Sequence, residues 1–468
     1  MKQTFQDYFR SLIGEAEAEQ FFCSIKDRQT RRSVRVNTLK TTKKELTIWL
    51  TSQCYSVKNN PFCTEGIDLE GRGEELSLKL PYHSGFTYPQ DSASMFGICV
   101  LSPRPGETVL DLTAAPGGKT TFIAQKMKNT GVLIANDMDT KRLKSLHYNL
   151  ERLGIWNAAV LRTQPHKIAE YYPNTFDKIL LDPSCSGEGL LVTPDGKPDF
   201  WSEKSLKRYA AEQYGLLLSA FRMLKPGGRL VFSTCTLNNI EDEGVVERLI
   251  EKMPDAYIED TAPASAPEQI GALKGIRFWP HKTHTKGFFC IAIGKKSATE
   301  EAEEIENSSE NKPANRHQKF KKSLPEKQNI KTLTEKQLEP FKNFISGYFG
   351  CELPPKAAFT IRDETLFMLS QELADFPLLP FYSLSFPLLK IYPDELRPTH
   401  AGALLLGIHA TRHVYALSRE EVLKAFLRQP IQNTSGEKGL YIAKYEDFPI
   451  GIAKLTDRGI EIVFPHQF

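Results

Sequence analysis

The strongest constraint on the fold of this chain is a regular alternation of short apolar strands and helices that starts near residue 107. Apolar runs at 108–112, 131–136, 176–181 and 229–232 are typical of buried strands. A helix is predicted over 119–127, and another over 140–153 from the spacing of Leu143, Leu146, Leu150 and Leu153. Such βαβ units pack as a parallel sheet covered on both faces. We therefore predict an α/β, Rossmann-like fold with a mostly parallel sheet, and a ligand at the carboxyl ends of its strands.

The length of 468 residues suggests about three domains. Residues 300–310 contain six glutamates and no basic residue, whereas 311–331 contain seven basic residues and one acidic residue. A segment so poor in apolar side chains cannot offset its ordering entropy, so 297–331 is predicted to be a charged linker. We expect a small α+β region over 1–90, the α/β domain over 91–296, and a small α+β module over 332–468.

The net charge of +3 excludes a uniformly basic protein, so any polyanion must be bound locally. Residues 26–44 hold eight basic residues and one acidic residue, which makes this stretch a candidate RNA contact, although a solvated face is the alternative. No signal peptide and no apolar run of membrane-spanning length is visible, and the eight cysteines form no C-x-x-C pair. We expect a reduced, cytoplasmic, monomeric protein without a membrane or metal partner.

A glycine-rich turn, Asp111-Leu-Thr-Ala-Ala-Pro-Gly-Gly-Lys-Thr120, follows the first strand of the α/β region. A P-loop NTPase motif fails here because Thr113 occupies the position of its first glycine. Asp137 and Asp182 follow two other strands, and acids at this rim suit a ligand with hydroxyls and positive charge, which favours S-adenosylmethionine over a triphosphate. The alternative is that Asp111 and Asp137 only cap helices.

Two cysteines, Cys185 and Cys235, lie on polar turns that follow two strands. A thiolate that adds to carbon 6 of a pyrimidine turns carbon 5 into a nucleophile able to accept a methyl group. A base must then remove the proton on carbon 5 so that the thiolate can leave. Two cysteines at one rim therefore indicate covalent methyl transfer to a pyrimidine.

The chain resembles the RsmB/RsmF (Sun/Nop2) family of RNA cytosine-5 methyltransferases over about residues 30–290, most closely its RsmF branch. The motifs that carry the resemblance are Arg35-Val-Asn37, Pro89-Gln-Asp-Ser-Ala-Ser-Met95, Ala115-Pro-Gly-Gly-Lys-Thr120, Asn136-Asp137, Asp182-Pro-Ser-Cys-Ser-Gly-Glu-Gly189, Leu224-Lys-Pro-Gly-Gly228 and Ser233-Thr-Cys-Thr-Leu237. The resemblance implies a class I methyltransferase domain that forms 5-methylcytosine in ribosomal RNA, namely the 16S RNA of the small subunit or its precursor.

The resemblance also implies roles for individual residues. Cys235 would be the nucleophile, Cys185 would assist product release, and Asp182 would contact the cytosine or the edge of the cofactor. Asp137 would bind the ribose of S-adenosylmethionine, and Gln164 lies where many members have an adenine-binding aspartate. The methionine part of the cofactor would be held by Thr113, Ala114, Ala115, Pro116, Gly117, Gly118 and Lys119. The Pro-Ser pair before Cys185 departs from the usual Ala-Pro, so this turn is expected to differ slightly.

Three further expectations concern RNA. Phe200-Trp201 and 278–281 are candidate stacking partners for a flipped base, with burial in the core as the alternative. Arg397-Pro-Thr-His400 resembles a segment of PUA-like RNA-binding domains, which makes 332–468 a candidate RNA-binding module. A catalytically silent ribosome-assembly factor is the alternative to an enzyme, and a P-loop NTPase is the third hypothesis.

Overall fold

The computed structural model describes residues 2–28, 30–71, 76–193, 201–260, 266–267, 269–270, 273–297, 329–380, 382–432 and 436–463. Its centre is a ten-stranded sheet in the order β11-β12-β13-β9-β8-β5-β6-β7-β16, with β10 paired to β13. The five central strands are parallel, and the strands at both edges are antiparallel to their neighbours. The strands are β5 (Thr108–Asp111), β6 (Val132–Asn136), β7 (Ala158–Leu161), β8 (Phe176–Leu181), β9 (Leu224–Thr234), β10 (Ala256–Ile258), β11 (Gln269–Ile270), β12 (Gly275–Phe278), β13 (Phe288–Lys295) and β16 (Tyr382–Leu384).

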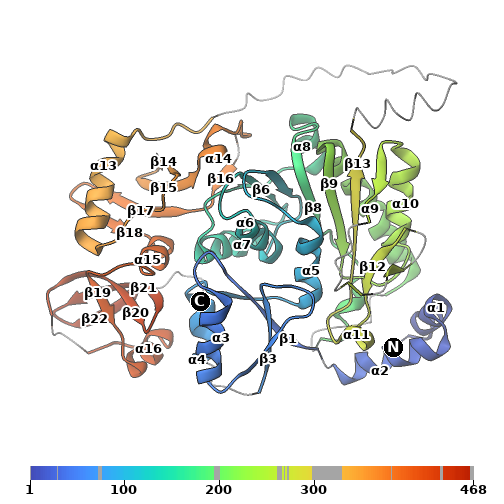
Figure 1. The fold of residues 1–468 in the computed structure, drawn as a ribbon, viewed down its shortest axis with the longest axis horizontal. Coiled ribbons are helices and arrows are strands. Elements are labelled where there is room, and N and C mark those ends of the chain that lie inside the picture. The colour runs from blue at the N-terminus through green and yellow to red at the C-terminus, as the bar shows by residue number, and fades with distance from the viewer. Residues whose placement is uncertain are drawn as a thin grey trace.

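Helices cover both faces of this sheet, as Figure 1 shows. One apolar cluster joins the sheet to α8, α9 and α10, and a second joins the opposite face to α5, α6 and α7. Leu110 belongs to the first cluster and its neighbour Val109 to the second, because successive strand residues point to opposite faces. The α/β prediction is thus confirmed. These helices are α5 (Ser92–Leu101), α6 (Gly118–Lys126), α7 (Thr140–Leu153), α8 (Pro165–Tyr171), α9 (Glu203–Met223) and α10 (Glu243–Lys252).

The amino-terminal part forms a four-stranded antiparallel sheet, β2-β3-β1-β4, with α3 and α4 beside it. Helices α1 and α2 precede this sheet and pack in one aromatic cluster with Trp201 and Trp279. The elements are α1 (Gln3–Ile13), α2 (Glu15–Asp27), β1 (Arg32–Val36), α3 (Lys43–Ser52), β2 (Ser56–Asn59), β3 (Gly66–Glu70), α4 (Leu76–His83) and β4 (Thr87–Pro89), with the short helix α11 (Pro280–Thr283) nearby.

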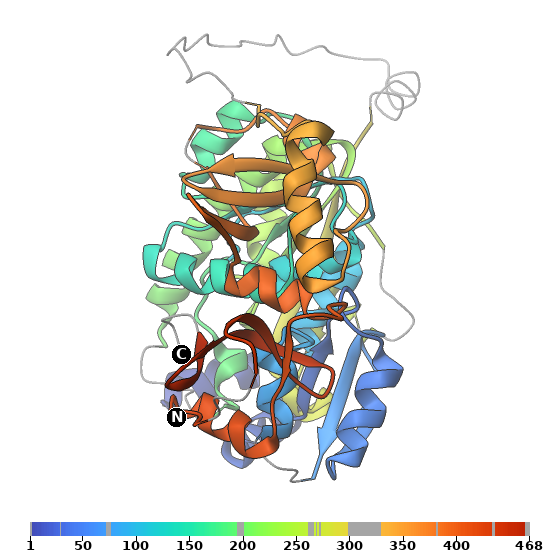
Figure 2. The same ribbon diagram turned by 90° about the vertical axis from the view of Figure 1, so that its left-hand side faces the viewer.

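The carboxyl-terminal part contains two more four-stranded sheets, β14-β15-β17-β18 and β19-β20-β21-β22. Figure 2 shows them one above the other. Their strands are β14 (Ala357–Arg362), β15 (Thr365–Ser370), β17 (Pro387–Tyr392), β18 (Glu395–Pro398), β19 (Val414–Ala416), β20 (Gly439–Tyr445), β21 (Phe448–Thr456) and β22 (Gly459–Val463). The helices are α13 (Glu335–Phe344), which continues into η3 (Ile345–Phe349), α14 (Gln371–Asp375), α15 (His400–Leu406) and α16 (Arg419–Phe426).

This carboxyl-terminal module is docked on the central sheet. Its strand β16 pairs antiparallel with β7, from Tyr382 opposite Leu161 to Leu384 opposite Ala159. Leu378 and Leu379 are buried in the same apolar cluster as the central strands. The module predicted over 332–468 therefore completes the central sheet and shares its core, although a charged linker is predicted between the two. Most of the predicted linker, residues 298–328, lies outside the described residues.

In the part of the chain that the structure describes, no helix has both the length and the apolar character needed to cross a bilayer.

Candidate active site

The glycine-rich turn joins β5 to α6 at the point where the strand order of the sheet reverses, between β5 and β8. Parallel sheets of this kind bind ligands at that point. Gly117 begins the helix with a φ of 106°, a conformation that favours glycine. The buried Arg35 of β1 donates hydrogen bonds to Gly118 O at 2.5 Å and to Thr121 Oγ1 at 2.7 Å. The amino-terminal sheet therefore braces the turn, and Arg35 has a structural role.

A cavity of 490 Å³ opens beside this turn. Its lining includes Cys235, Asp182 and every residue of 113–119 except Gly117. The other lining residues are Tyr88, Pro89, Gln90, Asp91, Ser94, Asp111, Leu190, Lys286, Gly287 and Phe288. The sequence motif 89–95 thus supplies one wall, although sequence reasoning gave it no role at the site.

Asp111 provides an independent test of whether this cavity suits a cationic cofactor. Its Oδ2 accepts a hydrogen bond from Thr120 Oγ1 at 2.7 Å, while its Oδ1 is buried without a partner. Burial raises the pKa of Asp111 to about 7. An ammonium group in the cavity would offset this cost, because an opposite charge stabilises the buried carboxylate. The cavity therefore fits a ligand that carries positive charge, and the alternative that Asp111 only caps a helix does not hold, because the N-cap residue of α6 is Gly117.

Asp137 and Gln164 lie on the same rim but outside the cavity lining. Asp137 is buried, and its Oδ2 accepts a hydrogen bond from Ala115 N–H at 3.1 Å and faces Arg142 at 3.5 Å. Arg142 also donates to Ala115 O. Gln164 is exposed at the start of α8. Asp137 and Arg142 hold the backbone of the turn, and the predicted ribose and adenine contacts of Asp137 and Gln164 stay predictions.

The two predicted cysteines meet. The Sγ atoms of Cys185 and Cys235 are 3.0 Å apart, although the two turns come from β8 and β9. Gly189 N–H donates to Cys235 O at 2.9 Å and ties the turns together. Both cysteines are free and partly exposed, and only Cys235 lines the cavity. The unusual Pro-Ser pair before Cys185 still brings its sulfur into contact with Cys235.

Asp182 and Lys119 form an ion pair at the cavity wall. Lys119 Nζ lies 2.7 Å from Asp182 Oδ2, and Ser233 Oγ donates to Asp182 Oδ1 at 2.9 Å. Burial opposes the charge of Lys119, but the adjacent Asp182 carboxylate raises its pKa, so the ammonium is retained. Lys119, which was predicted to hold the cofactor, faces both Asp182 and Cys235. Its partner could not be found from sequence, since the two residues lie on different βα turns.

Three of the aromatic residues predicted as stacking partners are buried away from the cavity. Trp201 and Trp279 are buried against α1 and α2, and Phe278 is buried in the core, so the burial alternative holds for them. Phe200 lies outside the described residues. The aromatic side chains that do line the cavity are Tyr88 and Phe288. Within the described ranges no group of three or more His, Cys, Asp or Glu side chains is arranged to hold a metal ion.

The basic stretch 26–44 divides into structural and exposed residues. Arg35 and Lys40 are buried, and Lys40 Nζ donates to the carbonyls of Ser84 and Arg152. The exposed members are Lys26, Arg28, Arg31, Arg32 and Lys44.

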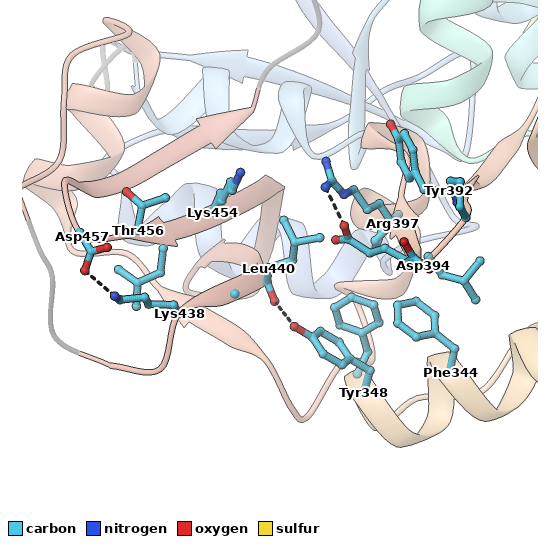
Figure 3. Close-up of a pocket in the computed structure, with 17 residues that line it drawn as sticks. Phe344, Tyr348, Tyr392, Asp394, Arg397, Lys438, Leu440, Lys454, Thr456 and Asp457 are labelled. Carbon is cyan, nitrogen blue, oxygen red and sulfur yellow. Dashed lines mark hydrogen bonds and ion pairs between the residues drawn. The ribbon is translucent and has the colours of Figure 1, made fainter.

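A larger cavity of 980 Å³ lies in the carboxyl-terminal module, between η3, the β17–β18 hairpin and the β20–β21 hairpin. Figure 3 shows aromatic rings and cationic side chains around it. Phe344 and Tyr392 are among its aromatic residues, and Arg397 lies over the Tyr392 ring with 4.8 Å to the centroid. Two lysines also line this cavity. Lys438 pairs with Asp457, whereas Lys454 forms no ion pair among the described residues.

Comparison with known proteins assigns the amino-terminal region and the central α/β domain to one family. Residues 98–293 match the family described as 16S rRNA methyltransferase RsmB/F, and residues 1–92 match the N-terminal domain of 16S rRNA methyltransferase RsmF. A ribosomal RNA small subunit methyltransferase F of Psychromonas ingrahamii is 30% identical over all of this chain and 97% of that protein. The protein of the same name from Aeromonas salmonicida is 31% identical over 96% of this chain and 93% of that protein.

Solved structures agree with this assignment. A methyltransferase homolog protein from Pyrococcus horikoshii is 32% identical, with a TM-score of 0.57 over 63% of this chain and 95% of that chain. The NSun6 structure from the same organism is 25% identical, with a TM-score of 0.57 over 63% of this chain and 98% of that chain. Together with the full-length relatives, these matches show that the chain belongs to the RsmB/F family of methyltransferases, in its RsmF branch.

Proposed function

We propose that this chain is an RNA cytosine-5 methyltransferase that acts on small-subunit ribosomal RNA through a covalent bond between Cys235 and the target base. The observation that carries the proposal is the pair of cysteine sulfurs 3.0 Å apart at the edge of a cavity that also contains Lys119 and Asp182. A single buried cysteine would be ordinary core packing. Two free sulfurs in contact at the rim of a methyltransferase sheet instead match the two tasks of forming and releasing a base adduct.

The cofactor is S-adenosylmethionine, which supplies an electrophilic methyl group. Residues 113–119, except Gly117, line the cavity beside Asp111, whose unpartnered carboxylate oxygen would accept a hydrogen bond from the cofactor's ammonium group. Lys119, Asp182 and Cys235 line the same cavity, and Lys119 is paired with Asp182. We propose that Asp111 faces the cofactor and that the Lys119–Asp182 pair faces the base.

The reaction follows from these positions. The Cys235 thiolate forms a bond to carbon 6 of the cytosine, and the displaced ring electrons make carbon 5 nucleophilic. Carbon 5 then takes the methyl group, after which a base removes the proton from carbon 5 and the carbon–sulfur bond breaks to release the thiolate. Asp182, held by Lys119 and Ser233, is placed at the wall where the ring would lie, and Cys185 is in contact with the departing sulfur.

The test uses the full chain with small-subunit ribosomal RNA, both free and in assembled subunits, and labelled S-adenosylmethionine. Cys235→Ala should abolish methyl transfer, because no other sulfur lines the cavity among the described residues. Cys185→Ala should accumulate a protein–RNA adduct that survives denaturation. Cys23→Ala, which removes an exposed cysteine of α2, is the matched control and should behave as the unmodified chain.

Bisulfite sequencing of the ribosomal RNA would then locate the 5-methylcytosine. Full methylation by Cys235→Ala would refute the covalent mechanism. If Cys235→Ala also supported every cellular role of the chain, the catalytically silent assembly factor would be the better description.

We also propose that the carboxyl-terminal module, 332–468 as predicted from the sequence, contributes RNA contacts through its 980 Å³ cavity. The support is the combination of aromatic rings, on which unpaired bases stack, with Lys454, a cation that forms no ion pair within 4 Å among the described residues. Tyr392→Ala and Lys454→Ala should each weaken RNA binding without loss of cofactor binding. Equal RNA affinity in both variants would remove this cavity from the interface, leaving the exposed cations of 26–44 as the remaining candidates.

A further inference from the structure

Two glutamates lie buried beneath the cysteine pair and outside the cavity lining. Glu188 opens the short helix η1 (Glu188–Leu190), and Glu241 precedes α10. Their exposed fractions are 1% and 0%. Across the described part of the chain, no lysine, arginine or histidine lies within ion-pair distance of either carboxylate. A buried acidic pair without a countercharge is costly, so the contacts that hold it need explanation.

Glu241 holds the turn that carries Cys185. Its Oε2 accepts a hydrogen bond from Ser186 N–H at 3.1 Å, and its Oε1 accepts one from Ser186 Oγ. Gln213 Nε2 donates both to Glu241 Oε2 at 2.8 Å and to Ser184 O at 3.0 Å. The residues on both sides of Cys185 are therefore fixed by Glu241 and its partner.

Glu188 holds the turn that carries Cys235. Its Oε2 accepts hydrogen bonds from Leu237 N–H at 3.2 Å and from Thr236 Oγ1. Asn238 Nδ2 lies 3.0 Å from Glu188 Oε1 and 3.0 Å from Glu241 Oε1, and so joins the two acids. One network thus sets the position of both sulfurs.

The charge of this network acts unequally on the two sulfurs. Burial and the nearby Glu241 raise the pKa of Glu188 to about 7, and both acids act electrostatically on Cys185. The contact with Cys235, burial, Glu241 and Glu188 together raise the pKa of Cys185. Cys235 instead faces the cavity and the Lys119 ammonium. Tyr8 also faces Glu188, and Asp242, which faces Tyr8 as well, is paired with Arg277.

We propose that the buried Glu188–Glu241 pair makes the two contacting sulfurs chemically unequal: its negative charge opposes ionisation of Cys185, while Cys235 faces Lys119 in the cavity and serves as the nucleophile. The pair consists of positioning residues, since neither glutamate touches the cavity. The inference rests on the proposed function only in naming Cys235 as the nucleophile. The difference between the two sulfurs is a property of the protein without RNA or cofactor.

The test measures Cys185 alone, in a Cys235→Ala background. Alkylation of Cys185 by iodoacetamide is followed from pH 6 to 10, with peptide mass mapping to separate it from the other cysteines. Glu188→Gln and Glu241→Gln, introduced singly, should each lower the pH midpoint of alkylation by about one unit, which is about a tenfold faster reaction below the midpoint. Two separate variants guard against one that fails to fold.

The controls separate charge from shape. Glu188→Asp keeps the charge and should leave the midpoint raised even if the plateau rate changes, whereas Glu247→Gln, exposed on α10, should change neither. With Cys235 intact, limiting iodoacetamide should label Cys235 in the unmodified chain and both sulfurs in the glutamine variants. An unchanged midpoint in a folded glutamine variant would overturn the proposal. Methyl transfer by Cys235→Ala would instead refute the proposed function and leave the thiol result standing.

Discussion

Removal of Arg277 should destabilise the catalytic sheet far more than removal of an exposed cation. Arg277 of β12 lies 2.9 Å from Asp242 Oδ2 and 2.7 Å from Glu243 Oε2, with exposed side-chain fractions of 2%, 0% and 13% for the three residues. Asp242 Oδ1 accepts a hydrogen bond from Thr234 Oγ1 at 2.7 Å, directly before Cys235. Arg277→Met would leave two carboxylates without their countercharge beneath the end of β9.

Breaking a buried ion pair in this way costs about 3–5 kcal/mol, because the remaining charge is desolvated and unpaired. For a folding unit of 150–250 residues this corresponds to a fall in Tm of about 6–20 °C. The matched control is Lys58→Met, which breaks a Lys58–Glu70 pair whose side chains are 59% and 57% exposed and should cost less than about 1 kcal/mol.

The assay is thermal unfolding of the full chain followed by near-ultraviolet circular dichroism at one pH and protein concentration. A triple variant, Arg277→Met with Asp242→Asn and Glu243→Gln, should recover most of the lost stability, since no charge is then left buried. A loss from Arg277→Met no larger than that of Lys58→Met would refute the reasoning. So would a triple variant as unstable as the single one.

Three further predictions concern the cofactor site and the docked module. Asp111→Asn should flatten the pH dependence of Tm in the cofactor-free chain. The pKa of Asp111 is raised to about 7, so its contribution to stability is present at acidic pH and is lost as pH rises through 7. A variant with the original slope of Tm against pH would contradict this. Gln164→Asp should tighten S-adenosylmethionine binding by up to about tenfold in calorimetry, since a carboxylate is the stronger acceptor; unchanged affinity would place Gln164 outside the adenine contact. Cleavage at a protease site inserted within 300–328 should leave two fragments that elute together in size-exclusion chromatography, because β16 pairs with β7; fragments that separate without denaturant would show that the shared sheet is weak.

The sequence was most informative where local pattern and tertiary structure coincide. The helix predicted over 140–153 is α7 (Thr140–Leu153), and the strand predicted over 176–181 is β8 (Phe176–Leu181), because each has an apolar period that its position in the sheet requires. The turn before α6 and the two cysteines could also be found from the sequence, because the chemistry requires their residue types whatever the rest of the fold.

What could not be predicted depends on contacts between distant segments. The strand β16 has three residues and no distinctive pattern, so nothing in its sequence indicates that it completes the central sheet. Glu188 was visible as part of a motif, but its partner Glu241 belongs to a different turn, and only folding brings them together. Arg35 is one of eight basic residues in the stretch 26–44, which suggests RNA binding. It is nevertheless buried against the cofactor turn, because its hydrogen-bond partners come from α6 and the segment after β4.

The origin of β16 has a consequence for how the chain is made. Until Tyr382–Leu384 leaves the ribosome, β7 is an unpaired sheet edge, and such edges recruit other strands. At about 5–20 residues per second, synthesis of the intervening chain takes roughly 10–45 s. During that interval the nascent catalytic sheet is open to misassembly, and a strand translated more than 200 residues after β7 closes it. Protection of this sheet edge is therefore tied to synthesis of the carboxyl-terminal module, and a product that ends before residue 382 would lack the edge strand.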